Sequence, residues 1–250
     1  MKTSFLPSSP ANRVYGWTIP ILFLLVHALI LHAVQAQTTD TPPPPSIVLS
    51  DMSQCTPKTG LSEDTRLDTW RLLPFESDEV QGTLIYAPSF VTAPELTLPL
   101  GVTGWHHIRL GIWQPKFTYD GKTAIRVKLS GDEAFRPITP PASNDSQKAT
   151  FLREIYFRAD DLTGRDLILR KLNGLVGRGC ALAYVKLDPI SPADVQKIEA
   201  DRAQRDTRNL VATIDGVSYF HYSEVSRPED VLEQIELYRH ADVAKVLWAV

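Results

Sequence analysis

Short runs in which apolar and polar residues alternate fill the middle of the chain. At 124–129, Ile125, Val127 and Leu129 alternate with Arg126 and Lys128. A two-residue period of this kind is typical of a β-strand with one buried face. Seven further runs of strand-like composition lie at 69–73, 82–86, 96–100, 106–112, 152–157, 166–169 and 181–187.

Turn-forming residues separate these runs. An Asp-Gly pair stands at 120–121, a Gly-Asp pair at 131–132, and glycines follow at 164 and 174. Prolines cluster between 137 and 141. Many short strands at this spacing, without a convincing helical pattern, predict a mainly β fold in which residues 46–190 form a β-sandwich or jelly roll.

The pattern changes after residue 190. Ser191, Pro192 and Asp194 follow the order of a helix N-terminus, with a cap, a proline at the first helical position and an acid in the first turn. The charged residues that follow predict a solvated connecting helix within 191–208. Residues 209–216 then form an almost continuous apolar run, which is typical of a strand buried on both faces.

A second helix and a second strand follow. Ser226 and Glu229 have the spacing of a capping box, and the apolar run at 243–250 predicts another buried strand. Strand, helix and strand make a βαβ unit with parallel strands, which we expect over 209–250. The apolar side chains that its helix places on one side are Val231, Leu232, Ile235 and Tyr238.

Residue 250 falls inside the second strand of this unit. A lone βαβ unit leaves the flanks of its sheet uncovered and is too small to bury a sufficient core. We therefore expect the 250 residues to be the front part of a longer protein that supplies the rest of an α/β domain.

The first residues contain the three parts of a secretory signal. Lys2 and Arg13 supply positive charge, an apolar run covers 17–34, and a Val-Gln-Ala sequence ends at Ala36. This predicts a signal peptide over 1–36. The next segment, 37–45, holds four consecutive prolines, which favour extended backbone and predict a linker.

An uncleaved membrane anchor is the alternative interpretation of the N-terminus. A spanning helix needs about 20 apolar residues, and this run is nearly that long but contains Pro20, His27 and His32. In both cases the remainder of the chain is exported, so we expect a secreted, periplasmic or cell-surface protein. Contact with a membrane is expected only through an uncleaved signal.

Charge and cysteine content narrow the choice of partner and compartment. The net charge is −3 and the pI is about 6.1, which gives no basic field for a nucleic acid. Export permits a disulfide between Cys55 and Cys180, the two cysteines of the chain. Two separate buried thiols are the alternative, and the sequence alone fixes no geometry that decides between them.

Several motifs of catalysis and cofactor binding are missing from the sequence. It contains no glycine-rich phosphate loop, H-E-x-x-H, C-x-x-C or G-x-S-x-G. His106 and His107 follow Trp105, but neighbouring residues of a strand point to opposite faces and cannot share one ion. We predict neither a metal nor a cofactor.

Three segments carry a resemblance to a known class of protein. They are residues 98–112 (LPLGVTGWHHIRLGI), 181–190 (ALAYVKLDPI) and 200–216 (ADRAQRDTRNLVATIDG). Together with the order of the parts, they resemble large exported bacterial proteins of glycoside-hydrolase type. In those proteins a galactose-binding-like β-sandwich precedes a (β/α)8, or TIM, barrel. The resemblance implies that 209–250 is the start of such a barrel.

The barrel interpretation places one set of candidate substrate-binding residues. In a barrel, catalytic side chains come from the C-terminal ends of the strands, and Asp215 holds that position in the first predicted strand. His221, Tyr222 and Glu224 lie in the loop after it. Hydrolysis of a glycosidic bond needs a pair of carboxylates. The sequence does not identify a complete pair, so no catalytic residue is assigned. We therefore expect these 250 residues alone to be inactive.

Aromatic residues of the predicted sandwich supply a second set. Trp105, Trp113 and Tyr119, with Asp120, lie near strand ends and loops, where aromatic rings and a few polar groups commonly bind sugars. The alternative is that both tryptophans are core residues beside one surface histidine. Our leading hypothesis is the N-terminal part of an exported carbohydrate-active enzyme. The rival hypothesis is a non-catalytic extracellular carbohydrate-binding or adhesion module.

Overall fold

The computed structural model describes residues 44–115, 125–138, 150–171, 179–215, 228–239 and 241–249. All of them belong to the compact unit Pro43–Val250. The predicted signal peptide lies outside the described residues, as does most of the predicted linker. Among the residues described, no helix has the length and apolar character needed to cross a membrane.

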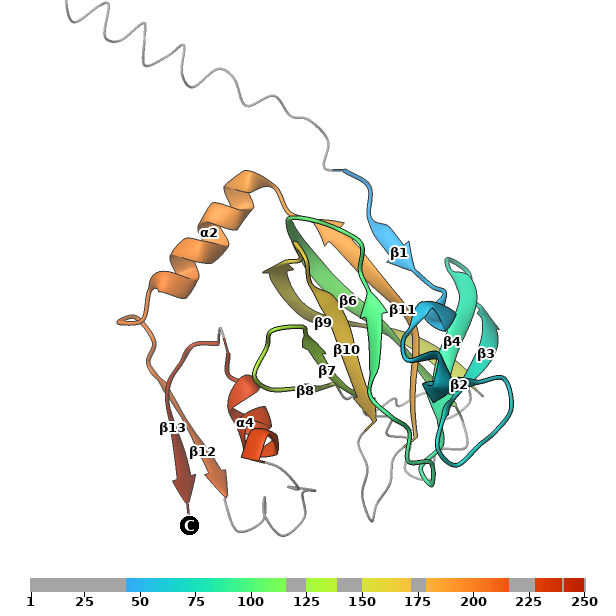
Figure 1. The fold of residues 1–250 in the computed structure, drawn as a ribbon. Helices are drawn as coiled ribbons and strands as arrows, with labels where there is room; N and C mark the ends of the chain where they lie inside the picture. The colour runs from blue at the N-terminus through green and yellow to red at the C-terminus, as the bar shows by residue number, and fades with distance from the viewer. Residues whose placement is uncertain are drawn as a thin grey trace, which may run out of the picture. The chain divides into compact units, whose positions relative to one another are not determined.

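Seven strands form the larger of two sheets in the predicted sandwich (Figure 1). Its central strand, β11 (Cys180–Pro189), pairs with β6 (Trp105–Pro115) on one side, and β6 pairs with the edge strand β9 (Thr150–Asp161). The remaining elements of this part of the chain are β1 (Ile47–Leu49), η1 (Met52–Gln54), η2 (Lys58–Gly60), β2 (Leu61–Ser62), β3 (Trp70–Glu76) and β4 (Gln81–Ala87). Both β1 and β4 pair with β11, and β4 continues the sheet through β3 to β2.

Four antiparallel strands form the smaller sheet. Their order is β5 (Leu96–Pro99), β10 (Asp166–Lys171), β7 (Ile125–Leu129) and β8 (Arg136–Ile138). Alternate apolar side chains of both sheets meet in one core, because successive residues of a strand point to opposite faces. Leu110, Val127 and Leu169 are fully buried there. The prediction of a mainly β fold built as a sandwich is confirmed.

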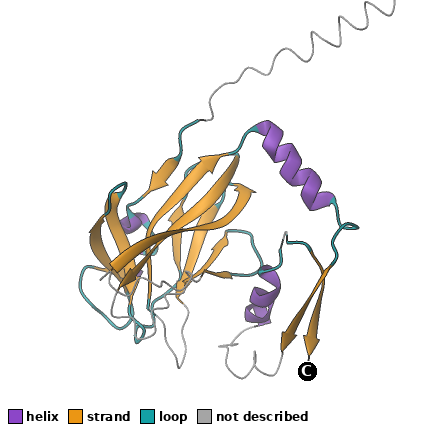
Figure 2. Cartoon of the chain, turned by 180° about the vertical axis from the view of Figure 1, so that it is seen from behind, coloured by secondary structure: helices purple, strands orange, loops and turns teal. Residues whose placement is uncertain are grey.

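All eight strand-like runs of the sequence are strands in the structure. They correspond to β3, β4, β5, β6, β7, β9, β10 and β11. Three short strands, β1, β2 and β8, were not predicted, because two or three residues cannot establish a period. Figure 2 shows that strands make up most of the described chain.

Gly82 of β4 lies beside the segment after β1, which forms a parallel bridge with β4 between Asp51 and Thr83. The amide of Thr83 donates to the carbonyl of Ser50 at 2.9 Å. A Cβ added at Gly82 would lie 2.1 Å from that same carbonyl oxygen. The neighbour is backbone, so it cannot move aside as a flexible side chain would, and glycine is required for this close approach.

We expect Gly82→Ala to lower the free energy of unfolding by about 3 kcal/mol, since the clash forces two backbone segments apart. Gly164→Ala is the control. Gly164 has φ +68° with nothing within 4 Å of an added Cβ, so its substitution should cost only about 1 kcal/mol of backbone strain. Urea unfolding of both variants measures the difference, and equal losses would contradict the close-approach argument.

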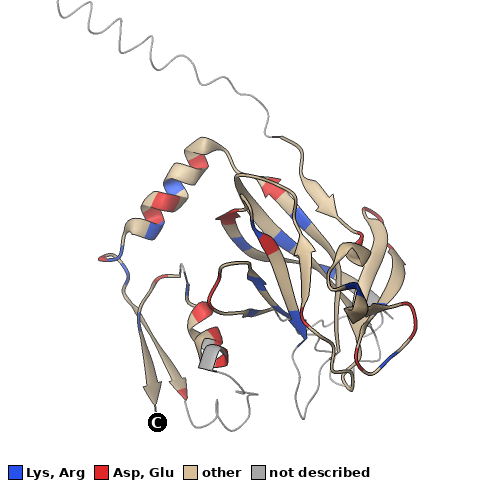
Figure 3. Ribbon diagram, in the orientation of Figure 1, with Lys and Arg blue, Asp and Glu red and all other residues tan. Residues whose placement is uncertain are grey.

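The predicted connecting helix is α2 (Pro192–Ala203). Ser191 caps it, with its Oγ accepting a hydrogen bond from the amide of Asp194 at 3.2 Å. No residue of α2 is buried, and residues of both charges are spread along it (Figure 3). The prediction of a solvated, proline-started helix is therefore confirmed.

The predicted βαβ unit is also present. The strands β12 (Leu210–Asp215) and β13 (Val243–Ala249) pair in parallel, and α4 (Pro228–Glu236) lies between them in sequence. The predicted burial of these strands on both faces is wrong for the described residues. Leu210 and Val211 are 57% and 56% exposed, and Ile214 is buried. Two described strands and one helix do not cover both faces of the sheet.

The acidic side of α4, and not its apolar side, is the buried one. Its apolar residues Leu232 and Ile235 are exposed, whereas the acidic residues Asp230, Glu233 and Glu236 are buried. The reason is a row of arginines on the sandwich, which pairs with these carboxylates. The capping box at Ser226 lies outside the described residues.

Candidate functional site

One face of the seven-stranded sheet carries aromatic and charged side chains. This outer face is the side turned away from the core, and a small second apolar cluster covers part of it. A register shift in the pairing of β11 with β6 falls between Leu182 and Tyr184. Such a bulge re-aims side chains, and here Ala183 and Tyr184 both belong to the outer cluster while Leu182 belongs to the core.

An aromatic pair occupies one end of the outer face. The rings of Tyr86 on β4 and Trp113 on β6 meet edge to face, with centroids 5.8 Å apart and planes at 82°. Both rings are half-buried, and β11 contributes the small buried side chains Ala181 and Ala183 to the same cluster. Because both rings are half-buried, part of the surface of each is accessible to a ligand.

A tyrosine crosses the centre of the outer face. Tyr184, Gly111 and Glu154 lie opposite one another on β11, β6 and β9. The Tyr184 ring passes over Gly111, where an added Cβ would lie 2.3 Å from it, and its hydroxyl donates to Glu154 Oε2 at 3.1 Å. Burial, followed by the charge of Glu154, raises the pKa of Tyr184 to about 12. The phenol therefore stays protonated and fixes the orientation of the carboxylate.

Charged side chains continue the face beyond this row. Arg109 Nη1 lies 2.9 Å from Asp188 Oδ2 and 3.7 Å from Glu154 Oε1, and Lys186 Nζ lies 3.9 Å from Glu154 Oε2. The hydroxyl of Ser46 donates to Asp188. The side chains of Arg109, Lys186 and Glu154 are each about one third exposed, at 38%, 29% and 33%. They offer donors and acceptors to a bound molecule.

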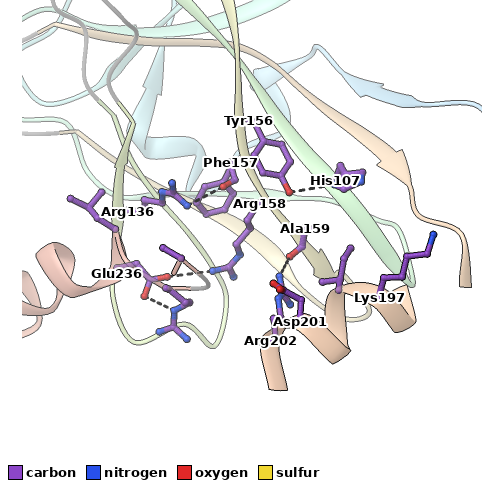
Figure 4. Close-up of a pocket in the computed structure, with 14 residues that line it drawn as sticks. His107, Arg136, Tyr156, Phe157, Arg158, Ala159, Lys197, Asp201, Arg202 and Glu236 are labelled. Carbon is purple, nitrogen blue, oxygen red and sulfur yellow. Dashed lines mark hydrogen bonds and ion pairs between the residues drawn. The ribbon is translucent and has the colours of Figure 1, made fainter. Parts of the chain in front are cut away.

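A pocket of about 530 Å³ opens at the far end of the outer face. It lies around the edge strand β9, between β6, β8, α2 and the turn after α4 (Figure 4). His107 and Tyr156 join it to the outer face, with His107 Nδ1 at 3.3 Å from the Tyr156 hydroxyl. Its other charged or aromatic lining residues are Arg136, Phe157, Arg158, Lys197, Asp201, Arg202, Glu236 and Arg239.

The tryptophans predicted to bind a sugar have different surroundings. Trp113 lies on the outer face beside Tyr86. Trp105 lies under the guanidinium of Arg202 from α2, which is 5.1 Å from the ring centroid, so it holds the helix in place.

His106 is buried, and its Nδ1 lies 3.0 Å from the Gly104 carbonyl oxygen, while His107 is half-buried. The structure thus brings Trp113 and His107 to the outer face.

Of the barrel-type candidates, the structure describes Asp215. Asp215 is exposed at the end of β12, opposite Ala249 of β13. Tyr119, Asp120, His221, Tyr222 and Glu224 lie outside the described residues. Within the described ranges, no group of three histidine, cysteine, aspartate or glutamate side chains is arranged to hold a metal ion.

The two cysteines are separate thiols. Cys55 and Cys180 are both free and fully buried in the core, so the structure has no disulfide between them and the bridged alternative is not formed. Burial is the main cause that raises the pKa of each thiol to about 12. Protonated, inaccessible thiols of this kind act as small apolar core residues.

Sequence reasoning missed most of the outer face. Arg109, Glu154 and Lys186 stand at alternate positions of their strands, where a polar residue indicates only a solvated face. Tyr86 and Tyr184 lie within strand-like runs, where the pattern predicts strand residues and no binding role. The signal that was available is Gly111, which lies between Leu110 and Ile112 in the middle of a strand, because glycine there often marks a close approach.

Comparison with known proteins assigns no family. No protein-family model matches the sequence, and no curated protein matches it. Among solved structures, the CBM36-1 domain of a multidomain xylanase from the hindgut metagenome of Trinervitermes trinervoides is similar. It is 12% identical, with a TM-score of 0.34, over 59% of this chain and 99% of that domain.

Two other solved structures are similar over part of their length. The Podospora anserina GH26-CBM35 β-(1,4)-mannanase is 9% identical, with a TM-score of 0.30, over 68% of this chain and 37% of that one. A complex of the plant peptide RALF23 with FER and LLG2 is 11% identical, with a TM-score of 0.33, over 61% of this chain and 42% of that one. This chain therefore spans well under half of either structure. At such identities and scores the function has to be argued from the residues themselves.

Proposed function

We propose that the β-sandwich is a saccharide-binding module of an exported carbohydrate-active protein. The observation that carries the proposal is the outer face, where partly open aromatic rings and charged side chains lie on one continuous surface. Saccharides present apolar ring faces and a rim of hydroxyls, so they need both kinds of group. Sites for such ligands combine aromatic walls with a few well-placed polar groups.

The chemistry of the face matches these two requirements. Trp113 and Tyr86 supply aromatic surface for a sugar ring. Glu154 accepts hydrogen bonds, and Arg109 and Lys186 donate them. Tyr184 holds Glu154 from below at 3.1 Å, so part of the polar set is positioned before a ligand arrives, which reduces the entropy lost on binding.

We also propose that the βαβ unit begins a barrel whose catalytic residues lie elsewhere in a longer protein. Its parallel strand pair and the place of Asp215 at the end of β12 support this interpretation. In that arrangement the sandwich binds the polysaccharide and the barrel hydrolyses it. Export follows from the predicted signal.

Affinity gel electrophoresis of the full chain against a panel of plant and bacterial polysaccharides tests the binding role. We expect retardation by at least one polymer and a loss of about tenfold or more in affinity for Trp113→Ala, since a central aromatic anchor contributes about 2 kcal/mol or more. Arg109→Gln, a less disruptive change, should weaken the same interaction.

Phe90→Ala is the matched control, because Phe90 is 65% exposed and belongs to neither apolar cluster. It should bind as the unmodified chain does. The proposal fails if no polymer retards the chain, or if Trp113→Ala and Phe90→Ala behave alike.

A further inference from the structure

The pocket at the far end of the outer face has an excess of positive charge. Five of its lining residues are lysine or arginine, and two, Asp201 and Glu236, are acidic. Glu236 is already engaged, with Oε2 at 2.6 Å from Arg239 Nε and Oε1 at 3.6 Å from Arg158 Nη1. Three of the five cations are thus compensated, because Arg158 also pairs with Asp132 and Asp160, and Lys197 pairs with Asp194.

Two of those cations are held in place by backbone carbonyls of the same strand. Arg202 Nη2 donates to the Ala159 carbonyl at 2.7 Å, and Arg136 Nη1 donates to the Phe157 carbonyl at 3.2 Å. Within the described part of the chain, neither guanidinium forms an ion pair. Each guanidinium has five N–H donors in a rigid plane, so both arginines keep donors for an incoming group while their positions are fixed.

Further features of the pocket favour an anion carried on a sugar. Arg158 also lines it. Its Nη2 lies 2.6 Å from Asp132 Oδ2, but its Nε is buried without a hydrogen-bond partner among the described residues. Tyr156, 51% exposed, lies opposite Arg109 in the strand register, so it links the pocket to the charged part of the outer face. Figure 4 shows the Tyr156 ring close to His107 and the arginines on both sides of β9.

We propose that this pocket binds the anionic substituent of an acidic sugar, a carboxylate or a sulfate, while the rest of the saccharide lies along the outer face. The inference rests on the proposed function, which it deepens by naming the class of saccharide. Arg136 and Arg202 contact the anion directly, since planar guanidinium donors match the oxygens of both groups. Tyr156 and His107 contact the sugar ring that carries it.

Affinity gel electrophoresis with matched polymers tests the inference. Polygalacturonate supplies carboxylates, carboxyl-reduced polygalacturonate supplies the same backbone without charge, and κ-carrageenan supplies sulfates. Neutral polymers from the panel of the binding test complete the set. We expect the full chain to bind a charged polymer at least tenfold more tightly than its neutral counterpart, and the charged polymer that is retained identifies the substituent.

Arg136→Gln and Arg202→Gln come from different elements and remove one charge each. Each should weaken binding of the charged polymer about tenfold, as expected for the loss of a charge-assisted hydrogen bond, and leave retention on neutral polymers unchanged. The control is Arg66→Gln, an equal charge change at an exposed residue outside the pocket. It should leave both interactions unchanged.

The possible failures are distinguishable. If neutral polymers are retained without preference for their charged forms, or if the pocket variants behave as Arg66→Gln does, the inference is overturned and the proposed function stands. An equal loss on charged and neutral polymers also overturns it, because the arginines would then act on the whole fold. If no polymer of either kind is retained, the inference and the proposed function fail together.

Discussion

Replacing Arg126 by methionine should release helix α4 from the sandwich and destabilise that contact by about 3–5 kcal/mol, the usual cost of removing one partner from a buried ion pair. Arg126 Nε lies 2.8 Å from Glu233 Oε2, and the two side chains are 10% and 4% exposed. Methionine preserves the length of the side chain but leaves Glu233 buried without its cation, so the loss is largest above pH 7, where Glu233 is ionised.

The Arg126 pair is one of three that attach α4 to the sandwich. Arg170 Nη1 lies 3.2 Å from Asp230 Oδ1, and Arg158 Nη1 lies 3.6 Å from Glu236 Oε1. The three acids are spaced three residues apart, so they lie along one side of the helix. The apolar residues Leu232 and Ile235 remain exposed, which leaves charge pairing as the main described attachment of this helix.

Hydrogen exchange of the α4 amides measures the release directly. Arg66→Met is the control, since it removes an exposed arginine and should leave exchange unchanged. The double variant Arg126→Met with Glu233→Leu should recover most of the protection, because replacing both ions of a buried pair by apolar residues is often neutral or stabilising. A double variant no better protected than Arg126→Met alone would contradict the account.

Glu233→Gln should remove a dependence of stability on pH. Burial is the main cause that raises the pKa of Glu233 from 4.5 to about 7; nearby Asp230 adds to the rise, while Arg126 and Arg170 oppose it. Between these values the native state binds a proton that the unfolded chain has lost. The stabilisation that comes from this bound proton is therefore fully present below pH 4.5 and is lost as the pH rises to about 7. The total loss in the free energy of unfolding is roughly 3 kcal/mol.

Urea unfolding at pH 5, 6, 7 and 8 measures this dependence. The unmodified chain should lose stability across the series up to pH 7, and Glu233→Gln should change much less because glutamine does not titrate. Glu63→Gln, at an exposed carboxylate, serves as the control and should keep the original slope. An unmodified chain whose stability is constant or rises from pH 5 to 7 would show that Glu233 is ionised in the docked helix.

The residue patterns predicted the strands well. When one face of a strand is buried, apolar and polar residues alternate along it, and this alternation is visible in the sequence of that strand alone. The run around Val127 and the Ser191-Pro192 helix start both carry their whole signal within a few neighbouring residues. The residues of α4 alone do not predict which of its sides is buried, because that side is set by arginines on β7, β9 and β10, far away in sequence.

The candidate site depended even more on distant pairing. Trp113 could be singled out because an aromatic residue at a strand end suggests a binding surface by itself. The row of Tyr184, Gly111 and Glu154 exists only through the register of three strands and the bulge at Tyr184, which no local pattern fixes. The pocket likewise needs α2 and the turn after α4 to meet β9.

The central claim, that the outer face binds a saccharide, is tested most directly by NMR of the indole N–H groups of the five tryptophans. Oligomers of the retained polysaccharide would be titrated into the labelled full chain. The account predicts that the Trp113 signal shifts, whereas Trp70 does not, because Trp70 is buried and its indole donates to the Pro94 carbonyl at 2.8 Å. A saturating titration that leaves Trp113 unmoved would contradict the account.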